Sequence, residues 1–149
     1  MMPIEYIVSG LPPLTFGAPA PISWEAFAAA CGDRLDENAF ADLERQLRNA
    51  LAEARGGGEK FRRETRGCSQ YWKNRILACF QEKDVLKLDE AVDKVWWEAA
   101  GELTDPVSPL GEGALSTYAV RLKIALKRSK ISQSKGMAAF DRLAETSST

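Results

Sequence analysis

Hydrophobic residues recur at helical spacing along most of the chain. A first apolar stripe, at positions i, i+3, i+4 and i+7, precedes Gly32, a residue that favours the end of a helix. A second stripe follows Asp36, which can cap a helix, and runs to the glycines at 56–58, where a turn or hinge is expected. The two stripes consist of Trp24, Phe27, Ala28 and Cys31, and of Phe40, Leu43, Leu47 and Leu51.

A third helix is expected from about Glu59 to Lys83. Gly67 offers an interruption in its middle, because glycine costs about 1 kcal/mol relative to alanine in a helix, and Ser69 offers a new cap. The apolar face of this helix would carry Phe61, Thr65, Cys68, Trp72, Ile76, Cys79 and Phe80.

The remaining pattern predicts three more helices. A fourth is expected near Leu88 to Leu103, ended by the prolines at 106 and 109. A fifth follows Gly113, and a short sixth is expected to pack back on the others. The inward positions of these helices are Val92, Val95, Trp96, Ala99 and Leu103 in the fourth, Leu115, Tyr118, Ala119, Leu122, Ala125 and Leu126 in the fifth, and Met137, Phe140 and Leu143 in the sixth.

The N-terminal segment has a different character. The apolar run at 6–8 is too short to distinguish a strand from one helical turn, and Pro12 and Pro13 end it. An extended arm is expected to lie across the helices until Ser23 caps the first of them, with Glu25 in its first turn. The sequence therefore predicts an all-α fold: a compact bundle of about five to six helices with an extended, proline-containing N-terminal arm.

Composition favours a single folded domain over residues 1–149. The chain of 149 residues is 45% hydrophobic, which is enough for one core, although a hinge at 56–58 between a two-helix part and a C-terminal part is an alternative. The formal charge of −1 and a pI near 5.6 give no overall attraction to nucleic acid or to anionic membranes.

The residues that carry most enzyme chemistry are sparse. The chain has no histidine, and its three cysteines are widely spaced, so neither a zinc site nor a cysteine nucleophile with an imidazole base is expected at Cys31, Cys68 or Cys79. We expect a non-enzymatic protein without metal or cofactor. The start lacks the features of a secretory signal, and no stretch approaches the roughly 20 apolar residues that cross a bilayer, so we expect a cytoplasmic protein with reduced thiols.

Charge is unevenly distributed along the second half of the chain. Residues 84–112 contain eight carboxylates and two lysines, whereas residues 114–140 contain only basic charges. The basic helix either docks on an acidic protein surface or pairs with the neighbouring acidic helix, and nucleic acid is the least favoured partner. Its side chains are Arg121, Lys123, Lys127, Arg128 and Lys130.

The pair Trp96-Trp97 is the other conspicuous feature. Adjacent helical residues point about 100° apart, so Trp97 must lie at an edge or face outward if Trp96 joins the core. Trp97 is then either a contact residue or a boundary residue covered by the loop at 106–110. The sequence thus assigns partner binding to Trp97 and to the five basic side chains of 121–130, and assigns no catalytic, cofactor or metal residue.

Several segments together resemble a known family. They are S-G-L-P-P-L-T-F-G at 9–17, I-S-W-E-A-F at 22–27, Y-W-K-N-R-I-L-A at 71–78, Y-A-V-R-L-K-I-A-L-K-R-S-K at 118–130 and K-G-M-A-A-F-D-R-L at 135–143. The order of these elements resembles an uncharacterised bacterial family encoded in V/A-type ATPase operons, which is thought to be similar to the all-helical C (or d) subunit between rotor ring and central stalk.

The resemblance implies a non-catalytic helical subunit or adaptor that contacts rotor or central-stalk subunits of a V/A-type ATPase and serves proton or ion transport. It would be peripheral to the membrane through its partners only. The alternative is a freestanding helical module that uses the basic helix at 121–130 to bind an acidic protein or, less favoured, nucleic acid.

Overall fold

The computed structural model describes the backbone of residues 3–54 and 70–147, and the side chains of these residues apart from 39, 40, 53 and 132–147. Within these ranges every regular element is helical, which confirms the all-α prediction. The elements in chain order are α1 (Ile4–Gly10), α2 (Trp24–Cys31), α3 (Glu37–Ala54), α4 (Gln70–Cys79), α5 (Val85–Ala100), the 3-10 helix η2 (Gly101–Leu103) and α6 (Glu112–Ser147).

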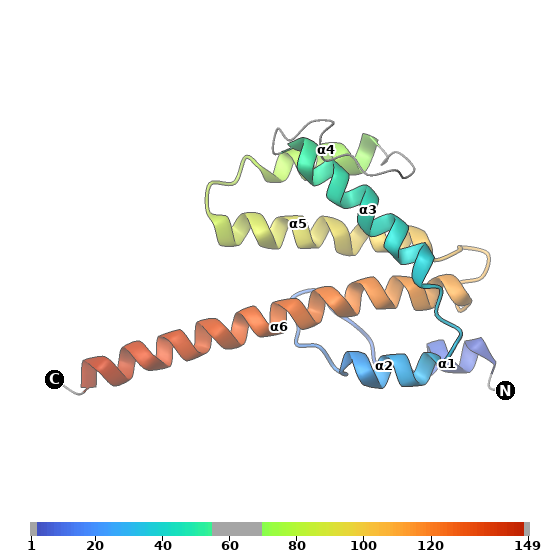
Figure 1. Ribbon diagram of the computed structural model, residues 1–149, viewed down its shortest axis with the longest axis horizontal. Helices are drawn as coiled ribbons and strands as arrows, with labels where there is room; N and C mark the ends of the chain where they lie inside the picture. Colours follow the sequence, from blue (N-terminus) through green and yellow to red (C-terminus); the bar gives the residue numbers. More distant parts are fainter. Residues whose placement is uncertain (1–2, 55–69, 148–149) are drawn as a thin grey trace.

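The long helix α6 is the axis of the molecule. Figure 1 shows α3, α4 and α5 on one side of it, with α1 and α2 on the other. The first half of α6 is buried between these two groups, and Leu115, Ala119 and Leu122 have no exposed surface. The second half continues past all the other helices to the C-terminal end (Figure 1).

The termini of two helices follow the predicted signals. The Ser23 hydroxyl accepts a hydrogen bond of 3.1 Å from the Ala26 amide at the start of α2, and Gly32 ends that helix with a φ of 60°. Asp36 accepts from the amide of Asn38, at 3.1 Å, where α3 begins. The start of α5 lies earlier than predicted, because Asp84 caps it through a 2.9 Å bond from the Leu86 amide.

The N-terminal arm lies against α6, as expected. The ambiguous run at 6–8 belongs to the short helix α1, and the arm extends from there to Ser23. The Tyr118 hydroxyl donates to the carbonyl oxygen of Pro12 at 2.7 Å, and the Ala20 amide donates to the Ser129 hydroxyl at 3.2 Å. These two bonds fix both ends of the extended segment to one helix.

Two predicted boundaries are wrong. The expected short sixth helix does not exist as a separate element, because α6 runs unbroken from Glu112 to Ser147. No proline falls within it, and a helix tolerates a glycine in its interior, here Gly136, at a cost of about 1 kcal/mol. The third predicted helix ends at Cys79 instead of Lys83, and the Phe80 amide closes the turn by donating to the Leu77 carbonyl at 3.1 Å.

Several predictions lie outside the described residues. They concern the hinge at 56–58, the first part of the third helix from Glu59, and the cap at Ser69. The described helices contain no segment that is both long and apolar enough to cross a membrane.

Gly113 offers a test of how closely the start of α6 packs against η2. A Cβ atom at this position would overlap the carbonyl oxygen of Leu103, which is backbone and cannot move aside easily. We expect Gly113→Ala to lower the free energy of unfolding by about 1–3 kcal/mol, as overpacked sites do. Urea unfolding followed by circular dichroism measures the change.

Gly10→Ala is the matched control, because a Cβ at Gly10 meets nothing within 4 Å and the residue lies in α1. We expect unchanged stability or a gain of up to about 1 kcal/mol. An equal loss in both variants would contradict the close approach of α6 to η2.

Candidate functional site

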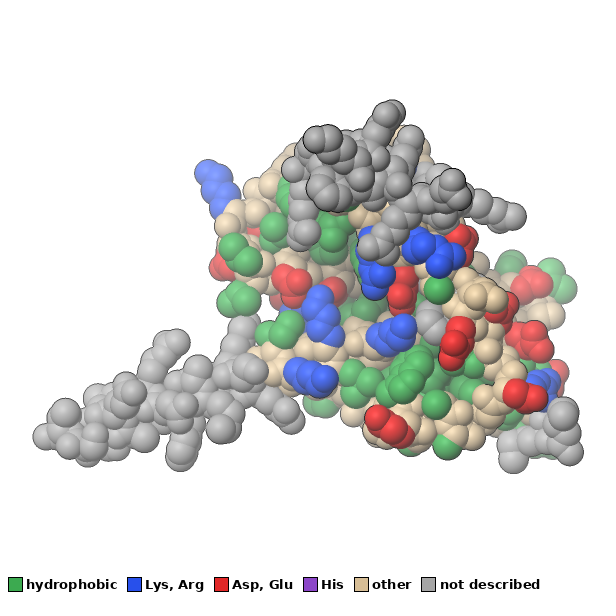
Figure 2. Space-filling model, viewed as in Figure 1, with side chains coloured by type: hydrophobic (Ala, Val, Ile, Leu, Met, Phe, Trp, Pro, Cys, Tyr) green, Lys and Arg blue, Asp and Glu red, His purple; other side chains and the backbone are tan. Residues whose placement is uncertain are grey.

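Charged side chains of both signs lie next to one another on the face shown in Figure 2. Lys and Arg side chains are interspersed there with Asp and Glu, and do not form a separate basic surface. The candidate site is therefore best described by the contacts of each residue that the sequence singled out.

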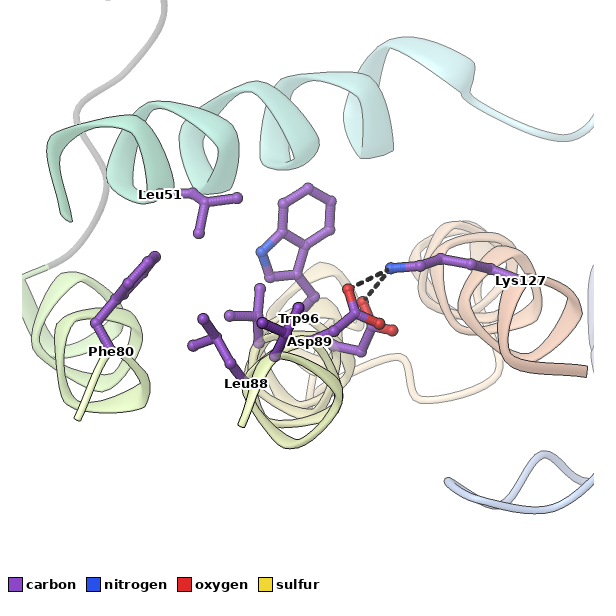
Figure 3. Close-up of a pocket in the computed structure, with 9 residues that line it drawn as sticks. Leu51, Phe80, Leu88, Asp89, Trp96 and Lys127 are labelled. Carbon is purple, nitrogen blue, oxygen red and sulfur yellow. Dashed lines mark hydrogen bonds and ion pairs between the residues drawn. The ribbon is translucent and has the colours of Figure 1, made fainter. Parts of the chain in front are cut away.

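A cavity of about 320 Å³, lined mostly by apolar residues, opens between α3, α5, α6 and the turn that follows α4. Figure 3 shows Leu51, Phe80 and Leu88 around it, with the indole of Trp96 between them and Lys127 of α6. The Nε1 atom of Trp96 is buried and has no hydrogen-bond partner among the described residues. Trp96 thus contributes to the core side of α5, as predicted, with an unpaired donor.

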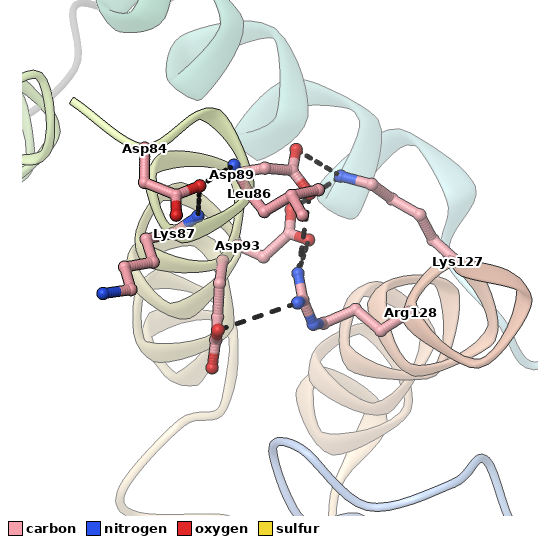
Figure 4. Close-up of polar contacts among 8 residues, drawn as sticks. Asp84, Leu86, Lys87, Asp89, Asp93, Lys127 and Arg128 are labelled. Atoms are coloured by element: carbon pink, nitrogen blue, oxygen red, sulfur yellow. Dashed lines mark hydrogen bonds and ion pairs between the residues drawn. The ribbon is translucent and has the colours of Figure 1, made fainter. Parts of the chain in front are cut away.

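A cluster of five charged residues joins α5 to α6 beside this cavity. Figure 4 shows Lys127 and Arg128 reaching from α6 to the carboxylates of α5. Lys127 Nζ lies 2.9 Å from Asp93 Oδ1 and 3.4 Å from Asp89 Oδ1. Arg128 lies 3.0 Å from Asp93 Oδ2, 3.5 Å from Asp89 Oδ2 and 4.0 Å from Glu90 Oε2.

Asp93 is the centre of this cluster. Its side chain is 7% exposed, against 42% for Asp89 and 57% for Glu90. Each of its carboxylate oxygens faces a different cation, which offsets the cost of removing the charge from water. Asp93 therefore holds α5 and α6 in one register, whereas Asp89 and Glu90 add solvent-screened contacts.

Lys123 makes a similar contact with another helix. Its Nζ atom lies 3.3 Å from Glu44 Oε1 of α3, and it also lies over the Trp24 ring of α2, at 5.4 Å from the ring centroid. The Glu44 side chain is only 14% exposed, so this carboxylate is largely buried between the helices. Lys130 is exposed.

Arg121 differs from the other basic residues of α6. Its Nε donates to the carbonyl oxygen of Trp97 at 2.9 Å, and its guanidinium lies 5.5 Å from the Trp97 ring centroid. It makes no ion pair within the described part of the chain. Burial lowers the pKa of Arg121, as expected for a half-buried cation without a neighbouring carboxylate.

Trp97 is covered by the N-terminal arm. Its ring meets Phe16 edge to face, with the ring centroids 5.6 Å apart, and Arg121 covers it from α6. The loop at 106–110 is one predicted cover for Trp97. The structure instead places Phe16 and Arg121 against the Trp97 ring. The guanidinium of Arg128 also lies over Phe16, at 5.8 Å from the ring centroid, so the arm packs against the basic part of α6.

The six residues predicted to bind a partner therefore divide into two kinds. Five make contacts within the chain, and two of these, Lys127 and Arg128, pair with carboxylates of the acidic helix α5. Lys130 alone among them is exposed without a described contact. Their role in partner binding stays a prediction. The five are Trp97, Arg121, Lys123, Lys127 and Arg128.

Two glutamates four positions apart, Glu98 and Glu102, connect helices. Arg75 of α4 donates to Glu98 of α5 at 2.6 Å, and Trp72 Nε1 donates to Glu102 at 2.6 Å. The hydrogen bond from Arg75 lowers the pKa of the Glu98 carboxyl. The i, i+4 spacing of the glutamates placed them on one face but gave no sign of their partners on α4.

The two described cysteines are structural in character. Cys31 is buried and Cys79 is half-buried, and burial raises the pKa of both thiols. Cys68 lies outside the described residues. Among the side chains that the structure describes, no group of three or more His, Cys, Asp or Glu is arranged to hold a metal ion.

Comparison with known protein families, with curated proteins and with solved structures finds no match to this chain.

Asp93 gives the sharpest test of the charged cluster. Asp93→Ala removes the buried carboxylate that Lys127 and Arg128 share and leaves them only the more exposed Asp89 and Glu90, so it should lower the free energy of unfolding by about 1–3 kcal/mol. Asp89→Ala is the matched control in the same cluster, with an expected loss of about 0–1 kcal/mol because Asp89 is more exposed. Chemical unfolding of both variants measures the difference, and equal losses would contradict the central position of Asp93.

The Arg75–Glu98 pair predicts a pH dependence. The pKa of Glu98 is lower in the folded protein than its ordinary value of 4.5, so the pair contributes stability above that value and loses it as pH falls through the folded pKa. Wild type should exceed Glu98→Gln by about 0–1 kcal/mol at neutral pH, since both side chains are more than a third exposed.

Thermal unfolding of the two proteins across acidic and neutral pH checks this. The difference in stability should vanish once Glu98 is protonated in the folded protein. A difference that grows as the pH falls below 4 would contradict the assignment.

Proposed function

We propose that the protein is a non-catalytic helical adaptor of a bacterial V/A-type ATPase, comparable in role with the C (or d) subunit. It would act through protein contacts with rotor or central-stalk subunits and so take part in proton or ion transport. Its place would be the cytoplasmic side of the membrane, held there by its partners. The sequence resemblance motivates this proposal, and the geometry of α6 supports it.

The supporting observation is the way α6 extends from the body. The helix has 36 residues, which corresponds to roughly 54 Å at the usual helical rise. Among the residues of α6 whose side chains the structure describes, the buried ones lie between Leu115 and Ala125, and the later part of the helix runs beyond every other helix in Figure 1. A helix whose first part is buried in the body and whose backbone continues beyond it is suited to hold a neighbouring subunit at a fixed distance.

The alternative of a freestanding module that binds through the basic helix has less support. Lys123, Lys127 and Arg128 are already paired with carboxylates of α3 and α5. An acidic partner or a nucleic acid would have to displace these intramolecular ion pairs, and the exposed Lys130 would remain as the main available charge.

Co-purification tests the adaptor proposal. Tagged full-length protein, co-expressed with the rotor and central-stalk subunits of a bacterial V/A-type ATPase, should retain at least one of them. Gly136→Pro should largely abolish this, because proline inside a helix costs about 3 kcal/mol and kinks it. Gly136→Ala is the matched control, and it should bind as the wild type does.

Two negative results of this experiment would contradict different parts of the proposal. No retention of any ATPase subunit by wild type would overturn the ATPase assignment. Retention that is equal for wild type and Gly136→Pro would overturn the role of the extended part of α6. Circular dichroism of both variants verifies that the body remains folded.

A further inference from the structure

A second cavity lies between the N-terminal arm and the start of α6. Its volume is about 270 Å³. The wall formed by the arm is apolar and comes from Val8, Leu11, Leu14 and two prolines, which have no amide hydrogen to donate. The opposite wall is formed by residues with polar side chains, namely Thr104, Thr117, Tyr118 and Arg121.

The hydroxyl protons of this wall are already committed. Thr117 donates to the carbonyl oxygen of Ala100 at 2.8 Å, so the 2.6 Å contact between Thr104 and Thr117 must use the proton of Thr104. Tyr118 donates to Pro12. A ligand in this cavity therefore meets only one side chain with protons to donate, which is Arg121.

Arg121 is a half-buried cation without a described anion. Only its Nε makes a hydrogen bond in the described chain, which leaves the four N–H groups of its two terminal nitrogens. Three neighbouring basic residues of α6 each face a carboxylate; they are Lys123, Lys127 and Arg128. Removing a charge from water is costly unless an opposite charge compensates for it.

We propose that this cavity binds a carboxylate group attached to a small apolar body, with Arg121 as the residue that holds the carboxylate. The planar guanidinium matches the two oxygens of a carboxylate, and the apolar wall matches the body. A single cation with no further donor suits a monoanion better than a phosphate. This inference is independent of the adaptor role, since it concerns the opposite end of α6 from Gly136.

Titration of the full-length protein with hexanoate tests the site, with hexan-1-ol as the uncharged analogue. Nuclear magnetic resonance should show saturable shifts for amides near Leu11 and Arg121 with hexanoate, and much weaker ones with the alcohol. Arg121→Met should weaken hexanoate binding about 10- to 100-fold, the effect expected when a hydrogen-bonded charge is lost. Arg48→Met removes an exposed arginine of α3 and should leave the affinity unchanged.

A cavity-filling variant guards against misfolding of Arg121→Met. Ala114 lines the cavity, so Ala114→Leu should weaken hexanoate binding while Arg121 is retained. A capped Leu-Glu-Leu peptide distinguishes the source of the carboxylate. Binding of hexanoate alone indicates a free small acid, and binding of the peptide alone indicates an acidic side chain of another protein.

Three results would overturn the proposal. They are saturable binding of neither ligand, hexan-1-ol binding as tight as that of hexanoate, and undiminished hexanoate affinity in folded Arg121→Met.

Discussion

The first half of α6 is buried on nearly its whole circumference, and the other elements are arranged to cover it. Leu115, Ala119 and Leu122 have no exposed surface, and Val120 on another side of the helix is 1% exposed. A helix that is apolar all round must be enclosed from several directions. The group α3–α5 supplies one cover, and α1, the extended arm and α2 supply the other (Figure 1).

Ion pairs hold α6 to its neighbours toward the end of its buried part. From Lys123 onward the helix meets carboxylates of α3 and α5, and the most buried of them, Asp93, accepts from both Lys127 and Arg128. Apolar packing restricts the register between helices by shape, and a buried carboxylate with two specific cations adds to this restriction, because registers that leave the charge unpaired are costly. In this way the acidic and basic segments of the sequence fix the position of α5 on α6.

Local signals in the sequence were sufficient for much of the fold. Ser23 and Gly32 delimit α2 as predicted, and the positions expected inside α5 and α6 include the buried Val95, Ala99 and Leu122. Each of these inferences depends on residues within one or two helical turns, where spacing and capping act directly.

Contacts between segments that are far apart in the sequence cannot be predicted from spacing and capping. That Phe16 covers Trp97, or that Glu98 pairs with Arg75, depends on which helices become neighbours. The lack of an ion pair at Arg121 among the described residues cannot be predicted from the sequence either. Lys123 and Lys127 are basic residues of the same helix, and they do form ion pairs. The prediction of a short sixth helix is wrong because a new apolar stripe does not by itself mark a new element, and no proline separates this stripe from the rest of α6.

The bond between Tyr118 and Pro12 joins residues 106 positions apart, and that between Ala20 and Ser129 joins residues 109 apart. At ribosomal rates of about 5–20 residues per second, the N-terminal arm is made roughly 5–20 seconds before the helix that receives it. Until α6 has been synthesised, the apolar side chains and prolines of the arm lack the surface against which they pack in the folded protein. The arm can thus complete its packing only after α6 has been synthesised, and a chaperone or partner that meets the nascent chain before then would find it accessible.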